Sequence, residues 1–320
     1  MSGPLRRACA ALLVAATAAL SLSACAGETS TGADTLTVGF VVDPSWAQIP
    51  VAQHSGAFTR HGVTVRVVNF ATGVQALQAL QGGQVDITTA ADVPTASALA
   101  KSNELRVVAD GSRWMGSRIV ARRGIENLNQ LAGKKIGTPL GTSAAYFAAK
   151  ALTSAGVDAE LVQVAPATIT TAIAKGDVDA VSIFQPYQAQ AVEVLGADAV
   201  ELDVPTDPYR QHSLYLAQAA VAQQKAATFR KFFDAVAEAS AALAAHDPAA
   251  TTAVADATKL APALVAKVLG EFDFTLQLRP ELAGNLDALA SWARSRNYLD
   301  PAVPAADYPR LLDPSALPQS

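Results

Sequence analysis

Short runs of β-branched and aliphatic residues alternate along the chain with alanine-rich stretches that have helical spacing. An earlier group of runs occupies residues 36–41, 63–70, 85–90 and 105–111, and a later group occupies residues 118–123, 134–140, 159–166 and 179–186. Alternation of this kind is typical of a parallel α/β sheet with helices on its faces. The break between the two groups favours two sheets over one.

The pattern changes after about residue 222, where we expect the strands to stop and helices to follow. Two apolar stripes with helical spacing lie in this region, and we interpret them as core: Phe229, Phe232, Phe233, Val236 and Leu243, then Leu282, Leu286, Leu289 and Ala293. We expect these C-terminal helices to pack on the first sheet and complete it.

Turns rich in helix-capping residues follow several of the predicted strands. They lie at residues 43–46, 71–73, 91–94, 141–143 and 185–187. In a parallel sheet such turns face a crevice at the carboxyl ends of the strands, where the amides of the next helix have no partner. Each turn has two possible roles. It can simply cap its own helix, which stabilises the fold by about 1 kcal/mol, or it can also take part in a shared anion site.

Ser143 follows a predicted strand in a segment that differs by one residue from the Gly-x-Ser-x-Gly elbow of hydrolases. Ala145 replaces the second glycine, and only His212 and His246 lie downstream as possible bases. We therefore interpret Ser143 as a binding residue and keep a secreted serine hydrolase as a distant alternative. No phosphate-loop lysine follows the glycine, and the spacing of His54 and His61 does not suit a metal site.

The N-terminal residues resemble an export leader. Arg6 and Arg7 precede an apolar run that ends in Leu-Ser-Ala-Cys, and that segment resembles a bacterial lipobox with Cys25 as the lipidation point. Residues 26–35 are small and polar, as expected of a flexible tether. We therefore expect an exported protein, anchored by lipid on the extracytoplasmic face of the membrane.

Charge and cysteine content narrow the function further. The formal net charge is -4, and removal of Arg6 and Arg7 makes the mature chain more acidic, which disfavours nucleic acid as a partner. Of the two cysteines, Cys9 lies in the leader and Cys25 at its end. The folded part can therefore have neither a disulfide bond nor a cysteine nucleophile.

Several segments, in their order and spacing, resemble the solute-binding proteins of ABC importers in the aliphatic-sulfonate, taurine, nitrate and thiamine-pyrimidine group. The segments are 49–52, 54–58, 61–63, 79–87, 131–137, 141–147, 176–180 and 185–187. The resemblance implies an α/β fold with two lobes, the type II periplasmic-binding-protein fold. Each lobe is then a mostly parallel sheet flanked by helices, and two crossover strands form the hinge, near residues 113–120 and 209–216.

The resemblance also implies boundaries and a function. It divides the chain into a signal peptide (1–24), the lipidated cysteine with its tether (25–35), a first part of lobe 1 (36–114), lobe 2 (115–212) and the completion of lobe 1 with the C-terminal helices (213–320). The implied protein is not an enzyme and needs no cofactor or metal. It is a monomer that captures a small sulfonate-like, taurine-like or nitrate-like solute and delivers it to a membrane permease.

Candidate ligand-binding residues follow from the turns and from the resemblance. They are Ser45, Trp46, Gln48, Thr72, Gly73, Asp92, Arg118, Gly141, Thr142, Ser143, Tyr146 and Gln185. Arg118 is included because a cation on a crossing strand could clamp an oxyanion. Asp43 and Asp92 would repel a simple anion and attract an amine, so a pyrimidine or another heteroaromatic amine stays open as an alternative solute. Pyrimidine-synthesising enzymes of the wider superfamily depend on cysteine, which the mature domain lacks.

Overall fold

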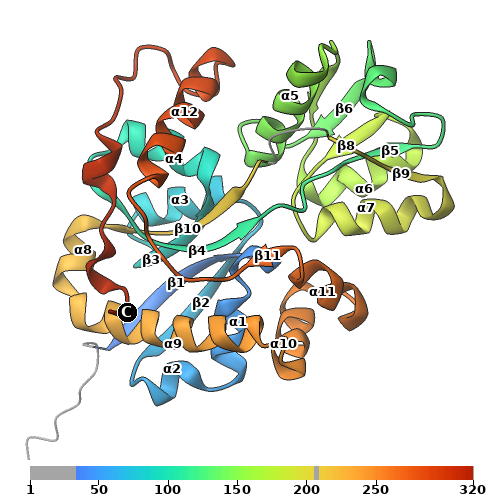
Figure 1. Ribbon diagram of the computed structural model, residues 1–320. Helices are drawn as coiled ribbons and strands as arrows, with labels where there is room; N and C mark the ends of the chain where they lie inside the picture. The colour runs from blue at the N-terminus through green and yellow to red at the C-terminus, as the bar shows by residue number, and fades with distance from the viewer. Residues whose placement is uncertain (1–33, 205–208, 320) are drawn as a thin grey trace, which may run out of the picture. The chain divides into compact units, whose positions relative to one another are not determined.

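The computed structural model describes residues 34–204 and 209–319, and these residues form one compact unit (Figure 1). The predicted signal peptide and the lipidation point at Cys25 lie outside the described residues. Among the described residues, none of the helices combines the length and the apolar character that a membrane crossing requires.

The first sheet has the strand order β11-β4-β10-β3-β1-β2. Its strands are β1 (Thr35–Val41), β2 (Thr64–Phe70), β3 (Ile87–Ala91), β4 (Leu105–Trp114), β10 (Gln211–Gln218) and β11 (Phe272–Asp273). β1 pairs in parallel with β2 and with β3, whereas β10 lies between β3 and β4 and is antiparallel to both. After the strands of the second sheet, the chain returns to the first sheet as β10.

The second sheet has the strand order β7-β6-β8-β5-β9. Its strands are β5 (Ile119–Arg122), β6 (Lys135–Thr138), β7 (Glu160–Gln163), β8 (Ala180–Ser182) and β9 (Ala199–Leu202). β6 pairs in parallel with β7 and β8, and β5 is antiparallel to β8 and β9. The expected arrangement of two sheets is confirmed, and both sheets are mixed. Most strands of each sheet point in one direction, but β10 and β11 in the first sheet and β5 in the second run against them, so antiparallel pairs are at least as many as parallel ones.

One prediction about strands was wrong. β11 lies at residues 272–273, beyond the point at which we expected strands to stop, and it pairs with the end of β4. A strand of two residues has no alternation for a sequence pattern to reveal. The chain leaves the first sheet after Trp114, enters the second at Ile119 and returns to the first at Gln211. The lobe boundaries assigned from the sequence refer to these two passages and stay a prediction.

Helices cover the sheets, as Figure 1 shows. They are α1 (Gln48–His54), α2 (Ala57–Arg60), α3 (Gly73–Gln81), α4 (Asp92–Lys101), α5 (Ser143–Ala155), α6 (Pro166–Lys175), α7 (Tyr187–Leu195), α8 (Ala219–Gln224), α9 (Ala226–Ala244), α10 (Pro248–Thr258), α11 (Pro262–Leu269) and α12 (Leu282–Ser295). α9 contacts α1 and α2, while α12 contacts α4. The C-terminal helices therefore pack on the layers that cover the first sheet, as predicted.

The predicted apolar stripes are buried. Phe229, Phe232 and Phe233 on α9 have no exposed surface, and Phe232 stacks on Phe58 of α2 with ring centroids 5.4 Å apart. The stripe on α12 is buried against α4 and the opposite face of the first sheet. Burial of these side chains fixes the first sheet between two helical layers, so the turns at its carboxyl edge rest on a rigid base.

Candidate functional site

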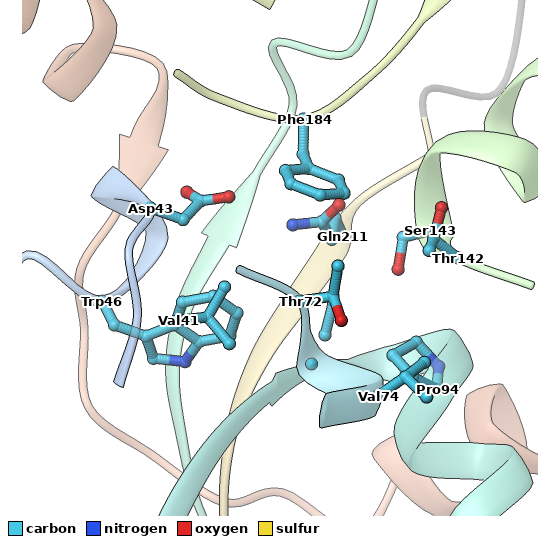
Figure 2. A pocket seen from close by; sticks show the side chains of 12 residues that line it. Val41, Asp43, Trp46, Thr72, Val74, Pro94, Thr142, Ser143, Phe184 and Gln211 are labelled. Carbon is cyan, nitrogen blue, oxygen red and sulfur yellow. The ribbon is translucent and has the colours of Figure 1, made fainter. Parts of the chain in front are cut away.

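A pocket lies where turns of the first sheet meet the start of α5 from the second sheet (Figure 2). The space within it, with the open mouth included, is about 380 Å³. Its lining residues are Val41, Asp43, Trp46, Thr72, Gly73, Val74, Ala91, Pro94, Thr142, Ser143, Phe184 and Gln211. Five of the twelve residues predicted from the sequence therefore meet there: Trp46, Thr72, Gly73, Thr142 and Ser143.

The beginning of α3 forms one wall of the pocket. The Thr72 hydroxyl accepts a hydrogen bond from the Gln75 amide at 3.3 Å, so Thr72 acts as the N-cap. Gly73 approaches β3 closely, since a Cβ atom at this position would lie 3.1 Å from the Cβ of Ala90. Glycine thus allows the first amides of α3 to lie against the end of the sheet, at the pocket.

The beginning of α5 forms the opposite wall. Gly141 has a φ of +74°, which favours glycine, and the turn places Ser143 as the first residue of the helix. The first intrahelical bond recorded here runs from the Tyr146 amide to Thr142, so the amides of the first turn have no partner within the helix. They give this side of the pocket directed donors and a partial positive charge.

The hydroxyl groups at this helix start are already engaged. The Thr142 hydroxyl donates to the Pro139 carbonyl at 2.6 Å, and the Ser143 hydroxyl donates to Asp92 Oδ1 at 2.8 Å. What α5 offers to a bound group is therefore its main-chain N–H groups, with Ser143 holding the helix start against α4. The assignment of Ser143 as a binding residue stays a prediction.

The geometry around Ser143 does not suit nucleophilic catalysis. Its hydroxyl contacts an acid directly, whereas a hydrolase places a histidine ring between the serine and the acid. Of the two downstream histidines, His212 directs its ring Nδ1 to Asp110 at 2.8 Å, and His246 lines a different pocket beside α9. The arrangement of the described residues gives the hydrolase alternative no support.

Asp92 is the hub of a buried network and does not line the pocket. Besides Ser143, its carboxylate accepts hydrogen bonds from the Tyr209 hydroxyl, the Val93 amide and the main-chain amide of His212. Burial raises the pKa of Asp92, and the nearby His212 opposes that rise. The network joins α4 of the first sheet to α5 of the second and to the chain segment that returns from the second sheet.

Asp43 lines the pocket on the other side. It follows β1, and its Oδ1 accepts a hydrogen bond from the Ser45 amide at 2.8 Å. Within the described part of the chain no basic side chain pairs with it, and burial raises the pKa of Asp43 from 3.8 to about 7. The charge of Asp43 also contributes, after burial, to the raised pKa of Tyr187 on α7.

Gln211 and Phe184 were not predicted from the sequence. Gln211 begins β10 and is only 2% exposed. Figure 2 shows its side-chain amide directed into the pocket beside the ring of Phe184. Neither residue belongs to a capping turn. The only sequence feature that could have identified Gln211 is its position at a predicted crossing between the lobes.

The seven other candidates lie outside the pocket lining. Besides Asp92, whose network is described above, four of them have structural contacts that explain their positions. Gln48 donates to the Gly111 carbonyl at 2.6 Å, and the Ser45 carbonyl accepts from Ser112, so both fasten the turn after β1 to β4. Tyr146 packs edge-on against Tyr209 and Trp292. Gln185 accepts from the Ala189 amide at the start of α7. The remaining three are Asp92, Arg118 and Gly141, and for all seven a ligand-binding role stays a prediction.

Arg113, and not Arg118, is the buried arginine of the crossing segment. Its guanidinium contacts Asp110 at 3.2 Å, Asp273 at 3.0 Å and the Thr275 carbonyl at 2.7 Å. Arg118 is half-buried and donates to the Met115 and Ser117 carbonyls of its own loop. The arrangement gives no support to the predicted oxyanion clamp at Arg118. Among the described residues no cluster of three or more potential protein ligands could hold a metal ion.

Comparison with solved structures establishes the fold. The structure matches the periplasmic aliphatic sulphonate binding protein SsuA from Escherichia coli with a TM-score of 0.75 at 22% identity, over 87% of this chain and 97% of that one. It matches the periplasmic nitrate-binding protein NrtA from Synechocystis with a TM-score of 0.69 at 12% identity, over 88% and 87% of the two chains. The fold is the two-lobe periplasmic-binding-protein fold.

Sequence comparison finds relatives over part of the chain. A protein of Brucella abortus described as a binding protein is 31% identical over 153 residues, 47% of each chain. The taurine-binding periplasmic protein of Escherichia coli is 28% identical over 141 residues, 42% of this chain and 44% of that one. The chain thus spans about half the length of the curated relatives that it matches. The model of the family described as NMT1/THI5 like matches residues 43–250, well over half of the chain. The chain therefore belongs to the NMT1/THI5-like family.

Proposed function

We propose that this protein is the extracytoplasmic solute-binding receptor of an ABC importer and that it captures a small oxyanion of the sulfonate, taurine or nitrate kind. One observation carries the proposal: the starts of α3 and α5, which belong to different sheets, meet at one pocket. The names of the relatives, which include taurine-binding and sulfonate-binding proteins, agree with it.

The chemistry of the two helix starts suits such a solute. Main-chain amides at a helix N-terminus bind a tetrahedral or planar oxyanion with directed donors and partial positive charge. Because Arg113 and Arg118 do not line the pocket, the proposed site relies on neutral donors. A site of this kind holds its anion without a full counter-charge, and the anion is shed again when the two walls separate.

Capture and release follow from the position of the pocket between the sheets. The chain passes between the sheets twice, and a small change of backbone angles in these passages would move α5 relative to α3. A solute that contacts both walls favours the closed arrangement by its affinity for it. We propose that the closed, loaded receptor delivers its solute to a membrane permease, that it works as a monomer, and that lipid at Cys25 anchors it outside the cell.

The first test is thermal denaturation of the mature chain, residues 26–320, with a panel of candidate solutes. The panel contains alkanesulfonates, taurine, nitrate, amino acids and hydroxymethylpyrimidines, the last because Phe184 and Trp46 give the pocket aromatic walls. A ligand that binds only the folded protein at a hundred times its Kd adds about 2.7 kcal/mol. A rise in Tm with one class of oxyanion is the expected result, and no rise with any member of the panel would overturn the proposal.

Two substitutions at Ser143 separate the amide from the hydroxyl. Ser143→Pro removes the amide at the first position of α5, where proline is tolerated, and the extended backbone of Thr142 is compatible with a following proline. Ser143→Ala keeps the amide and loses only the hydrogen bond to Asp92. We expect the proline variant to lose about 2 kcal/mol of binding, the scale of a bond to a charged group, and the alanine variant clearly less.

The matched control is Thr153→Ala, an exposed position near the other end of the same helix, which should leave the Kd unchanged. Isothermal titration calorimetry of the three variants gives the comparison. Equal losses for Ser143→Pro and Thr153→Ala would contradict a binding role for the start of α5.

A further inference from the structure

The pocket has a second polar side that the oxyanion site does not use. Figure 2 shows Asp43 across the pocket from Thr142 and Ser143, with the Gln211 amide between them. Asp43 is 3% exposed, and the donor groups beside it come from Ser45: the main-chain amide at 2.8 Å, and a side chain near enough to oppose the rise in the pKa of Asp43. A buried carboxyl group that lacks a counter-charge is costly to keep unless something else satisfies it.

The surroundings of Asp43 in the pocket are mostly apolar. Val41 and Trp46 lie on its own side of the pocket, and the ring of Phe184 faces its carboxyl group (Figure 2). Among the described residues no hydrogen bond joins these walls to the second carboxylate oxygen, and the one donor they contain, the Trp46 indole N–H, is buried without a partner. Gln211 is the adjacent polar group of the pocket lining, and its side chain is almost fully buried. Asp43 and Gln211 are therefore available to a molecule that fills the pocket.

We infer that the natural solute carries a hydrogen-bond donor, either a protonated amine or a ring N–H, at the end opposite its oxyanion, and that Asp43 accepts this donor. The inference rests on the proposed function and narrows it to amino-substituted organic acids with a small apolar body. The acid group binds at the starts of α3 and α5, the body lies against Phe184, and Gln211 contacts the polar edge of the solute.

Asp43 also acts against other solutes. A simple anion in the same pocket faces a carboxylate in a site of low dielectric constant, where repulsion between like charges is strong. The amine of the proposed solute converts this repulsion into a charge-assisted hydrogen bond. Asp43 is thus a specificity-determining residue. It attracts amino-substituted acids and repels the parent acids that lack the amine.

The experiment compares matched pairs of solutes on the purified protein. Each pair consists of an acid and its amino derivative: an alkanesulfonate with the ω-aminoalkanesulfonate of the same length, and a benzenesulfonate or benzoate with its aminomethyl derivative. Calorimetry at pH 8 gives both Kd values. We expect the amino member of at least one pair to bind ten- to a hundredfold more tightly than its parent.

Asp43→Asn tests the residue itself. Asparagine keeps an acceptor for the Ser45 amide, so the turn is retained, while the charge is lost. In this variant we expect the preference for the amino member to fall to about one, with the parent acid binding as well as before or better. Ser143→Pro should weaken both members of the pair equally.

The outcomes separate the two proposals. Equal binding of both members of every pair, or a preference that survives Asp43→Asn, would overturn the role of Asp43 and leave the oxyanion receptor intact. Binding of amines without any acid, unaffected by Ser143→Pro, would instead contradict the oxyanion site. A thermal melt of each variant without solute shows that the variants are folded.

Discussion

At the scale of single residues, Asp43 links binding to stability. Burial raises its pKa to about 7 in the folded protein, so between about pH 4 and pH 7 the folded state holds a proton that the unfolded chain has released. Stability therefore falls as the pH rises through this window. Asp43→Asn removes this effect. We expect the difference in the free energy of unfolding between the variant and the wild type to favour the variant by about 2 to 3 kcal/mol more at pH 8 than at pH 5.

Urea denaturation at the two pH values measures this difference. The control is Asp177→Asn, the same substitution at an exposed position. A gain for Asp43→Asn that does not depend on pH would show that the carboxyl group titrates normally in the folded protein. A stabilising substitution that abolishes solute selectivity is the expected signature of a residue retained for function.

At the scale of elements, α9 is the helix on which the first sheet depends. Phe232 stacks on Phe58 and meets Tyr215 and Phe233 edge-on, without any exposed surface. We expect Phe232→Ala to cost about 3 to 5 kcal/mol of unfolding free energy, because the rigid layers cannot close the cavity. Arg230→Ala on the exposed face of the same helix should cost less than about 0.5 kcal/mol. Chemical denaturation compares the two, and similar costs would contradict the assignment of the buried face.

At the scale of the whole molecule, the Asp92 network joins the elements of the two sheets. Its carboxylate accepts from Ser143 of α5, from Tyr209 and from the His212 amide of β10. Asp92→Ala leaves these buried donors without their acceptor, and we expect it to cost about 2 to 4 kcal/mol of unfolding free energy.

The comparison for Asp92→Ala is Asp198→Ala, which removes the exposed ion pair between Arg123 and Asp198 and should cost at most about 1 kcal/mol. Urea denaturation of both variants tests the prediction. If Asp92→Ala costs no more than its exposed counterpart, the network does not hold the two sheets together. Solute titration of Asp92→Ala measures how far the Asp92 network contributes to closure around the solute.

The local and periodic features of the fold could be predicted from the sequence. The alternation of apolar runs gave the strand groups, and the spacing of Phe229, Phe232 and Phe233 gave a buried helix face, because burial imposes a period that the residues must follow. Thr72, whose hydroxyl caps α3, and the Gly141-Thr142-Ser143 turn, whose glycine has a positive φ, marked the starts of α3 and α5, because both signals come from residues adjacent in the chain.

Which side chains share one pocket was decided only by the tertiary structure. Asp92 and Gln185 have the residue types of a site, yet their oxygens are used within the protein, by Ser143 and by the Ala189 amide. Gln211 and Phe184 belong to no local motif and still reach the pocket. The sequence by itself determined most of the elements, although not β11, because most elements depend on neighbours in the chain. The tertiary structure alone decided the site, because a polar group faces a ligand only when no other part of the fold has satisfied it.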